Sequence, residues 1–212
     1  MLGDDRLLSE SLSRFLIGGS VVDQGHVEEL YREAIACAER SGDGYVMVML
    51  HNNAANQALQ TGNIPNAHDH LDVATRLSHE IGVTISNVKI TMGVVLREEG
   101  DFEGARVMLN DGLRISRRNG DRFGLAYSTS GLACLASDLA EWQRSAELHG
   151  VAQSYLDQIG HPWLPYGHRF REASLQEVRA HLGDEEFRTL YAKGRELSFD
   201  RAIESALKVG SD

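Results

Sequence analysis

The residues with the most obvious chemical potential are the nine histidines of the 212-residue chain. His68, Asp69 and His70 are adjacent, but residues two apart on a helix point to different faces. His68 and Asp72 have the four-residue spacing that places two ligands on one helix face, yet the sequence identifies no third ligand. We therefore expect a solvated helix face here, with no metal site and no cofactor.

The sequence gives nucleophilic catalysis no better support. Cys37 and Cys134 lie far apart and without a CxxC spacing, which is typical of a reduced cytoplasmic protein. Cys37 is expected to pack in the core. A Ser/His/Asp hydrolase needs a strand–turn–helix elbow for its nucleophile, and no such motif is present. We therefore expect the chain not to be an enzyme.

Composition narrows the class of protein further. The chain is 42% apolar, enough for a buried core, and its formal net charge is −10. The longest uninterrupted apolar run, 45–50, is far shorter than the roughly 20 residues that span a bilayer. An acidic surface repels phosphate groups, so direct nucleic-acid binding by this segment is disfavoured. These features predict a helical, cytoplasmic protein without membrane association.

The elements that would position any site follow a fixed period along the first 160 residues. One series of small residues falls at Gly42, Gly82, Gly120 and Gly160, and a second at Gly25, Gly62, Gly100 and Ala140. Glycine tolerates the left-handed conformation that ends a helix, and the Asn or Asp that often follows can cap the next helix. The pattern predicts pairs of antiparallel helices at about 5–42, 43–82, 83–120 and 121–160. Several pairs must stack, because no pair buries its own core.

This pattern resembles the tetratricopeptide repeat (TPR). The second unit matches it at Ala55, Gly62, Asn63, Ala67, Leu71 and Ala74, and the third at Gly93, Gly100, Asp101, Ala105, Leu109 and Gly112. The usual aromatic residue near position 4 is missing, and the period of 37–40 residues exceeds the standard 34. The resemblance implies an all-α, TPR-like α-solenoid of about four helix pairs.

After Gly160 the period stops, and two of the three prolines fall at Pro162 and Pro165. Beyond them we predict a helix over 166–182, a short helix with Asp184 as its N-cap that ends at Gly194, and a last helix from Ser198. Residues 161–212 would then form C-terminal capping helices.

The C-terminal region suggests a narrower relationship. The phrases at 143–152, 179–187, 194–198 and 202–207 resemble the C-terminal MalT-like TPR region of bacterial LuxR-type and STAND-ATPase transcriptional regulators. The phosphate-binding motif GxxxxGK[ST] and a basic helix-turn-helix segment are both missing, so ATPase and DNA-binding functions are not carried over. The chain is either a stand-alone relative or part of a longer regulator.

The TPR resemblance also implies a ligand-binding groove. Defined positions of each first helix line the concave surface of TPR arrays, and here they fall on Asn52, Asn53, Asn56, Asn87, Thr91, Arg97, Tyr127 and Ser130. Amides both donate and accept hydrogen bonds, which suits a peptide backbone. Asn87, Thr91 and Phe15 replace the cations of the chaperone-type carboxylate clamp, which disfavours a C-terminal carboxylate ligand. Alternatively, these amides bond to neighbouring helices or to water and are packed by the C-terminal region.

We therefore expect a non-catalytic module that binds a protein, peptide or small effector in its groove, as the sensory part of a LuxR/MalT-like regulator. A bound ligand would change the curvature or self-association of the array. One alternative is a TPR receptor for peptide pheromones. Another is a purely structural self-association module, a homodimer formed through the apolar segment Arg6–Ile17 with Leu7, Leu8, Leu12, Phe15 and Leu16.

Overall fold

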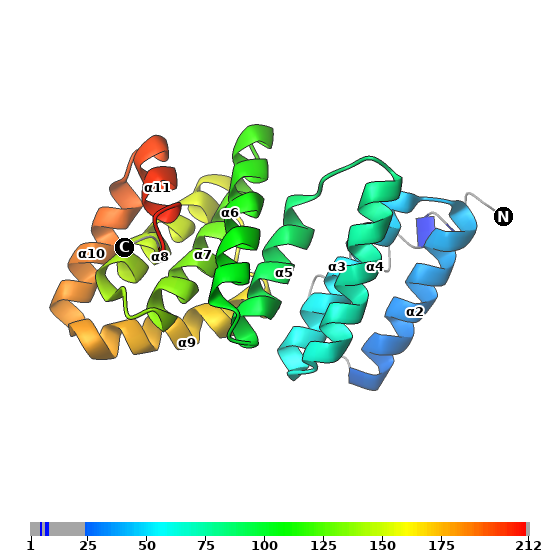
Figure 1. The fold of residues 1–212 in the computed structure, drawn as a ribbon, viewed down its shortest axis with the longest axis horizontal. Coiled ribbons are helices and arrows are strands. Elements are labelled where there is room, and N and C mark those ends of the chain that lie inside the picture. The colour runs from blue at the N-terminus through cyan, green and yellow to red at the C-terminus, as the bar shows by residue number, and fades with distance from the viewer. Residues whose placement is uncertain (1–4, 6, 9–23, 211–212) are drawn as a thin grey trace.

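The computed structural model describes residues 5, 7–8 and 24–210, and in these ranges every regular element is a helix (Figure 1). The expected all-α class is confirmed. The helices are α2 (Gln24–Ser41), α3 (Gly44–Thr61), α4 (Ile64–Glu80), α5 (Ser86–Glu98), α6 (Phe102–Asn119), α7 (Arg122–Asp138), α8 (Trp142–Ile159), α9 (Pro165–Leu182), α10 (Asp184–Glu196) and α11 (Phe199–Ala206).

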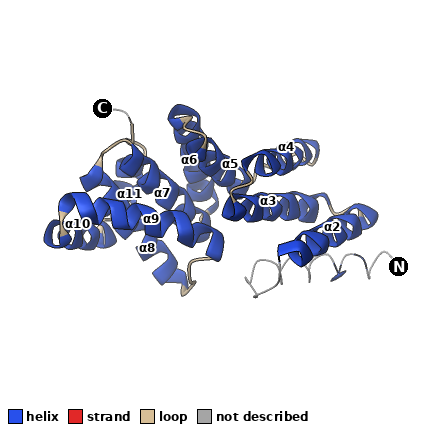
Figure 2. Cartoon of the chain, turned by 90° about the horizontal axis from the view of Figure 1, so that it is seen from below, coloured by secondary structure: helices blue, strands red, loops and turns tan. Residues whose placement is uncertain are grey.

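Helices that follow one another in the chain pack together as pairs: α3 with α4, α5 with α6, and α7 with α8. The pairs lie in a row along the long axis of the molecule, with α2 toward one end and α10 and α11 toward the other (Figures 1 and 2). Each pair also contacts the next, through α4 with α5 and α6 with α7. Helix α9 departs from this order, because it contacts α7, α8 and the distant α3.

Short turns join the helices, and these turns carry residues that end one helix and cap the next. Gly62, Gly120 and Gly160 follow α3, α6 and α8 in the left-handed conformation that the spacing predicts. Asp101 and Asp121 then accept hydrogen bonds of 2.9 Å from backbone amides in the first turns of α6 and α7. The turn before α8 differs, because Ala140 takes the left-handed conformation with φ 59°.

Small residues allow adjacent pairs to approach closely. A Cβ on Gly93 of α5 would lie 2.6 Å from Cγ of Leu109, and one on Gly131 of α7 would lie 2.5 Å from Cδ2 of the same leucine. Leu109 of α6 is itself fully buried. The two glycines therefore make room for one leucine where three helices meet.

Helix α7 is the most deeply buried of the helices described. Every residue from Gly124 to Ser137 is buried, although four of them are serine or threonine. Helices α5, α6 and α8 cover part of its surface, while α9 and α11 cover the rest. Its sequence therefore has little one-sided character, as expected for a helix with neighbours on all sides.

The last two helices pack on α8. Gly150 of α8 faces the backbone of Tyr191, and Gly194 of α10 faces the backbone of Glu147, so a Cβ at either position would collide with main-chain atoms. Gly194 is therefore required by this contact and does not end the helix, since α10 continues to Glu196. The predicted N-cap Asp184 is also wrong: Gly183 takes that position, and Asp184 lies in the first turn, where the helix dipole favours a carboxylate.

The first predicted pair is only partly described. Segment Arg6–Ile17, with Leu12, Phe15 and Leu16, lies outside the described residues except for Leu7 and Leu8, which are 66% and 41% exposed. Gly25 lies in the first turn of α2 rather than ahead of it, unlike the turn glycines of the later pairs.

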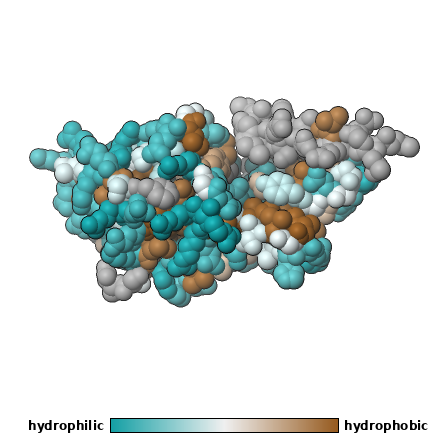
Figure 3. All heavy atoms as spheres, turned by 90° about the horizontal axis from the view of Figure 1, so that it is seen from above, coloured by the Kyte–Doolittle hydropathy of each residue, from teal (hydrophilic) through white to brown (hydrophobic). Residues whose placement is uncertain are grey.

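The surface is mostly hydrophilic in the view of Figure 3, with an apolar patch near the middle of the molecule. Over the residues described, no helix combines the length and the apolar character needed to cross a membrane.

The turns allow a direct test of backbone strain. Gly120→Ala is expected to lower the free energy of unfolding by about 1 kcal/mol, because a side chain is strained at its φ of 68° although no neighbour lies within 4 Å. Ala140→Gly is expected to raise that free energy by up to about 1 kcal/mol for the same reason. Urea denaturation of both variants measures the two effects. A loss of stability in Ala140→Gly would contradict the assigned turn conformation.

Candidate functional site

A cavity opens on the face formed by the first helices of three successive pairs, α3, α5 and α7. Seven of the eight residues predicted to line a groove also line this cavity; the exception is Asn53. Their role in binding stays a prediction. The lining comprises Asn52, Asn56, Leu59, Asn87, Ile90, Thr91, Val94, Arg97, Tyr127, Ser130, Gly131, Cys134, Gly167, Phe170 and Arg171.

Helix α9 supplies a further wall of the cavity. Gly167, Phe170 and Arg171 face the cavity from this helix, which was predicted to belong to the C-terminal cap and, in the alternative interpretation, to pack on the amides of the groove. A Cβ on Gly167 would lie 2.6 Å from Cε1 of Tyr127, so the glycine lets α9 approach that ring. The one available signal was the proline pair Pro162 and Pro165, which permits the chain to turn back after α8.

Polar contacts fix α9 along the groove. Arg169 donates a 2.8 Å hydrogen bond from Nη1 to the carbonyl oxygen of Gln60, at the end of α3. At the other side, Ser137 of α7 donates to Glu177 at 3.2 Å. Helix α9 therefore reaches from the α7–α8 pair to the α3–α4 pair, and it covers part of the face formed by α3, α5 and α7.

The asparagines of α3 are buried rather than exposed in an open groove. Asn56 is 5% exposed and accepts a 3.3 Å hydrogen bond from Oγ1 of Thr91 on α5. Asn52 is 2% exposed, and its Oδ1 has no hydrogen-bond partner among the described residues. The Nδ2 of Asn53, outside the cavity, is likewise unpartnered within the described ranges. Unpaired polar atoms at this depth are rare and costly.

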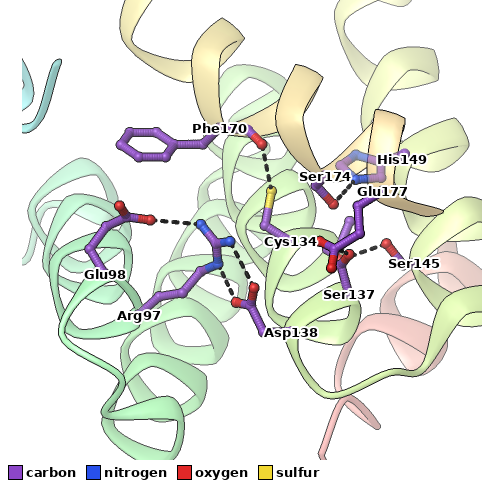
Figure 4. Close-up of polar contacts among 11 residues, drawn as sticks. Arg97, Glu98, Cys134, Ser137, Asp138, Ser145, His149, Phe170, Ser174 and Glu177 are labelled. Atoms are coloured by element: carbon purple, nitrogen blue, oxygen red, sulfur yellow. Dashed lines mark hydrogen bonds and ion pairs between the residues drawn. The ribbon is translucent and has the colours of Figure 1, made fainter. Parts of the chain in front are cut away.

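The two arginines in the lining already have acidic partners. Arg97 of α5 donates from Nη2 to Asp138 at 2.9 Å and from Nη1 to Glu98 at 3.0 Å (Figure 4). Arg171 of α9 donates from Nη1 to Glu172 at 3.0 Å, and its guanidinium lies 4.8 Å from the ring centre of Trp163. Its positive charge is therefore balanced.

The remaining donors of Arg171 are nearly all used as well. Its Nη2 donates to Oε1 of Gln153 at 3.1 Å and to the hydroxyl of Tyr191 at 3.0 Å. Its Nε has no partner within the described part of the chain, although the side chain is only 8% exposed. One donor of a buried cation is thus left without a partner in the part of the chain described, on a residue that lines the cavity.

Next to the cavity lies a buried group of a cysteine, a serine and a histidine, of which Cys134 also lines the cavity (Figure 4). The Nε2 of His149 on α8 lies 2.9 Å from Oγ of Ser174 on α9. The Sγ of Cys134 on α7 lies 3.7 Å from the carbonyl oxygen of Phe170. The three side chains come from three helices, so their meeting could not be read from sequence spacing.

Burial keeps the ionisable members of this group uncharged at neutral pH. Burial, together with the positive charges of Arg171 and Arg97, lowers the pKa of His149 to about 3. Burial also raises the pKa of the Cys134 thiol, an effect that Arg97 partly opposes. A nucleophilic cysteine needs to become a thiolate while a neighbouring histidine takes up its proton. Burial disfavours both of these charged forms, the thiolate of Cys134 and the imidazolium of His149.

The histidines considered as metal ligands have other partners. His68 lies 3.0 Å from Glu99 instead of pairing with Asp72. His70 lies 3.0 Å from His51 of α3, measured between the two Nδ1 atoms, and burial lowers the pKa of His51 to about 4. Among the described residues, no three His, Cys, Asp or Glu side chains gather in a way that could hold a metal ion.

Comparison of the sequence with known protein families, with curated proteins and with solved structures gives no match.

The buried His149 predicts a pH-dependent stability. The pKa of His149 in the folded protein, about 3, lies below the usual value near 6.5. Between pH 3 and pH 6.5 the unfolded chain therefore binds one proton at His149 that the folded protein does not bind. The contribution of His149 is therefore complete above about pH 6.5 and is lost as the pH falls, by up to about 1.4 kcal/mol per pH unit.

Urea denaturation at pH 7 and pH 5 tests this prediction by comparing the wild type with His149→Gln, which removes the titrating group but keeps a partner for Ser174. The loss of stability at pH 5 is expected to be smaller in the variant. His168→Gln, at an exposed position of α9, is the matched control and should behave as the wild type. Equal losses in all three proteins would contradict the assignment.

Proposed function

We propose that this chain is a non-catalytic, TPR-like α-solenoid module that binds a small effector in its concave cavity. The repeated helix pairs, the left-handed turn residues and the small residues between pairs support the TPR-like architecture. The phrases of the C-terminal region that resemble LuxR/MalT-like regulators support a sensory role in such a cytoplasmic regulator. The chain would then act through a protein partner or an attached domain, without contacting DNA itself.

The observation that carries this proposal is the cavity together with its unpartnered polar atoms. Oδ1 of Asn52 and Nε of Arg171 belong to side chains that are more than nine-tenths buried, and both residues line the same space. Burying such atoms without partners costs free energy that a ligand could recover. Sites for small molecules commonly combine mostly apolar walls with a few polar groups of this kind.

The position of α9 favours a small effector over an extended peptide. The part of α9 from Phe170 to Glu177 packs against one face of α7. A peptide that ran along the whole groove would have to displace this part of α9. A peptide-pheromone receptor therefore requires a large rearrangement. Self-association through Arg6–Ile17 remains an independent alternative, because that segment lies almost entirely outside the described residues.

The cavity is also placed so that binding can change the shape of the array. Its walls come from α3 in one pair, from α5 and α7 in the next two, and from α9. A ligand that contacts all four helices would bind best at one particular arrangement of the pairs. Differential binding of this kind shifts the balance between curvatures and could bias an attached ATPase.

Extraction of a natural ligand tests the proposal. The full chain is incubated with a small-molecule extract of bacterial cells, recovered by ultrafiltration and denatured, and the released molecules are identified by mass spectrometry. Val94→Phe should abolish specific retention, because Val94 lines the cavity and the larger ring would fill it. Val107→Phe, at a 41% exposed position of α6, is the matched control and should retain the same molecules as the wild type.

Circular dichroism and thermal unfolding would verify that both variants fold. Equal retention by the wild type and Val94→Phe, or no specific retention by the wild type, would contradict effector binding in this cavity.

A further inference from the structure

We infer that the cavity takes a slim, neutral molecule with an apolar body and a head group that both donates and accepts a hydrogen bond, a primary amide being the simplest example. This inference rests on the proposed function and adds the chemical class of the effector.

The size and shape of the space limit the ligand. The cavity and the solvent-filled opening around it together enclose about 630 Å³ of free space. Only about 40 Å³ of it is wide enough for the centre of a water molecule. A narrow slot of this kind accepts an unbranched chain or the edge of a flat ring more readily than a branched or globular molecule.

The walls determine the body of the ligand. Leu59, Ile90, Val94 and Phe170 present apolar side chains from α3, α5 and α9, and the ring of Tyr127 lies among them. The hydroxyl of that tyrosine accepts a 2.7 Å hydrogen bond from the backbone amide of Leu164. An apolar chain in contact with these walls would gain about 0.8 kcal/mol for each buried methylene group.

The unpartnered atoms determine the head group. Oδ1 of Asn52 is an acceptor and lacks a donor, whereas Nε of Arg171 is a donor and lacks an acceptor. A primary amide or a hydroxyl group supplies both functions at once. A group with only one of them would leave the other buried atom unpaired.

The charges of the lining select for a neutral ligand. Asp138 and Glu98 balance Arg97, and Glu172 balances Arg171. A carboxylate would therefore bring an uncompensated negative charge into a largely apolar space. An ammonium group would face two guanidinium groups without an acidic partner of its own.

Three six-carbon probes test this inference directly: hexanamide, hexanoate and hexylamine. Each is titrated against the full chain at pH 7 up to its solubility limit and followed by ligand-observed NMR. Hexanamide is expected to bind saturably and at least tenfold more tightly than either charged probe. Equal affinities for the three probes, or no saturable binding of hexanamide, would overturn the proposed ligand class.

Paired variants identify the polar contact. Asn52→Leu has nearly the same shape but lacks Oδ1, and it should weaken hexanamide binding five- to tenfold. Asn110→Leu removes an equally buried and unpartnered Oδ1 on α6, outside the cavity, and should leave the affinity unchanged. If both variants bind hexanamide as tightly as the wild type, Asn52 does not bond to the head group of the ligand and the inference fails.

The two proposals can fail separately. If a natural molecule binds the wild type but not Val94→Phe while hexanamide does not bind, the cavity is an effector site and the inferred chemistry is wrong. If Val94→Phe retains everything that the wild type retains, the proposed function itself is wrong.

Discussion

The burial of α7 from every side is the constraint on which the rest of the structure depends. A helix whose residues from Gly124 to Ser137 are all buried must have neighbours on every side. Helix α9 supplies the neighbour on the side of the cavity, because the chain turns back after α8 and returns across the face of the pairs. The same contact closes one side of the cavity, so the packing of α7 and the candidate site have a common origin.

This packing places polar groups where they need internal partners. Ser137 donates to Glu177, Ser174 contacts His149, and the guanidinium of Arg171 has acidic, amide and hydroxyl partners. Networks of this kind favour one position of α9 over others, since sliding the helix would leave buried groups unpaired. Some buried polar atoms still lack partners among the described residues. Two of them, Oδ1 of Asn52 and Nε of Arg171, belong to residues that line one cavity.

Much of the local structure was predictable from the sequence. The period of the glycines predicted the turns, and the Asn and Asp residues after them cap the following helices through hydrogen bonds of 2.9–3.3 Å. The short C-terminal helix was predicted less well, because Gly183 replaces Asp184 as its N-cap and Gly194 lies within it. At Gly194 a tertiary contact with the backbone of Glu147 decides where the glycine lies, and local signals carry no information about such a contact.

The sequence by itself determined the helical class and the turns, because these depend on residues close together in the chain. The face on which Asn52, Asn56 and Thr91 lie was predicted from the TPR resemblance. Only the tertiary structure decided that α9 covers this face and that Arg171 joins the asparagines, since residues more than 100 positions apart meet there. The packing of α9 on this face decides which polar atoms are buried and which of them have hydrogen-bond partners. Helix propensity and spacing are local quantities, whereas burial is a property of the whole fold.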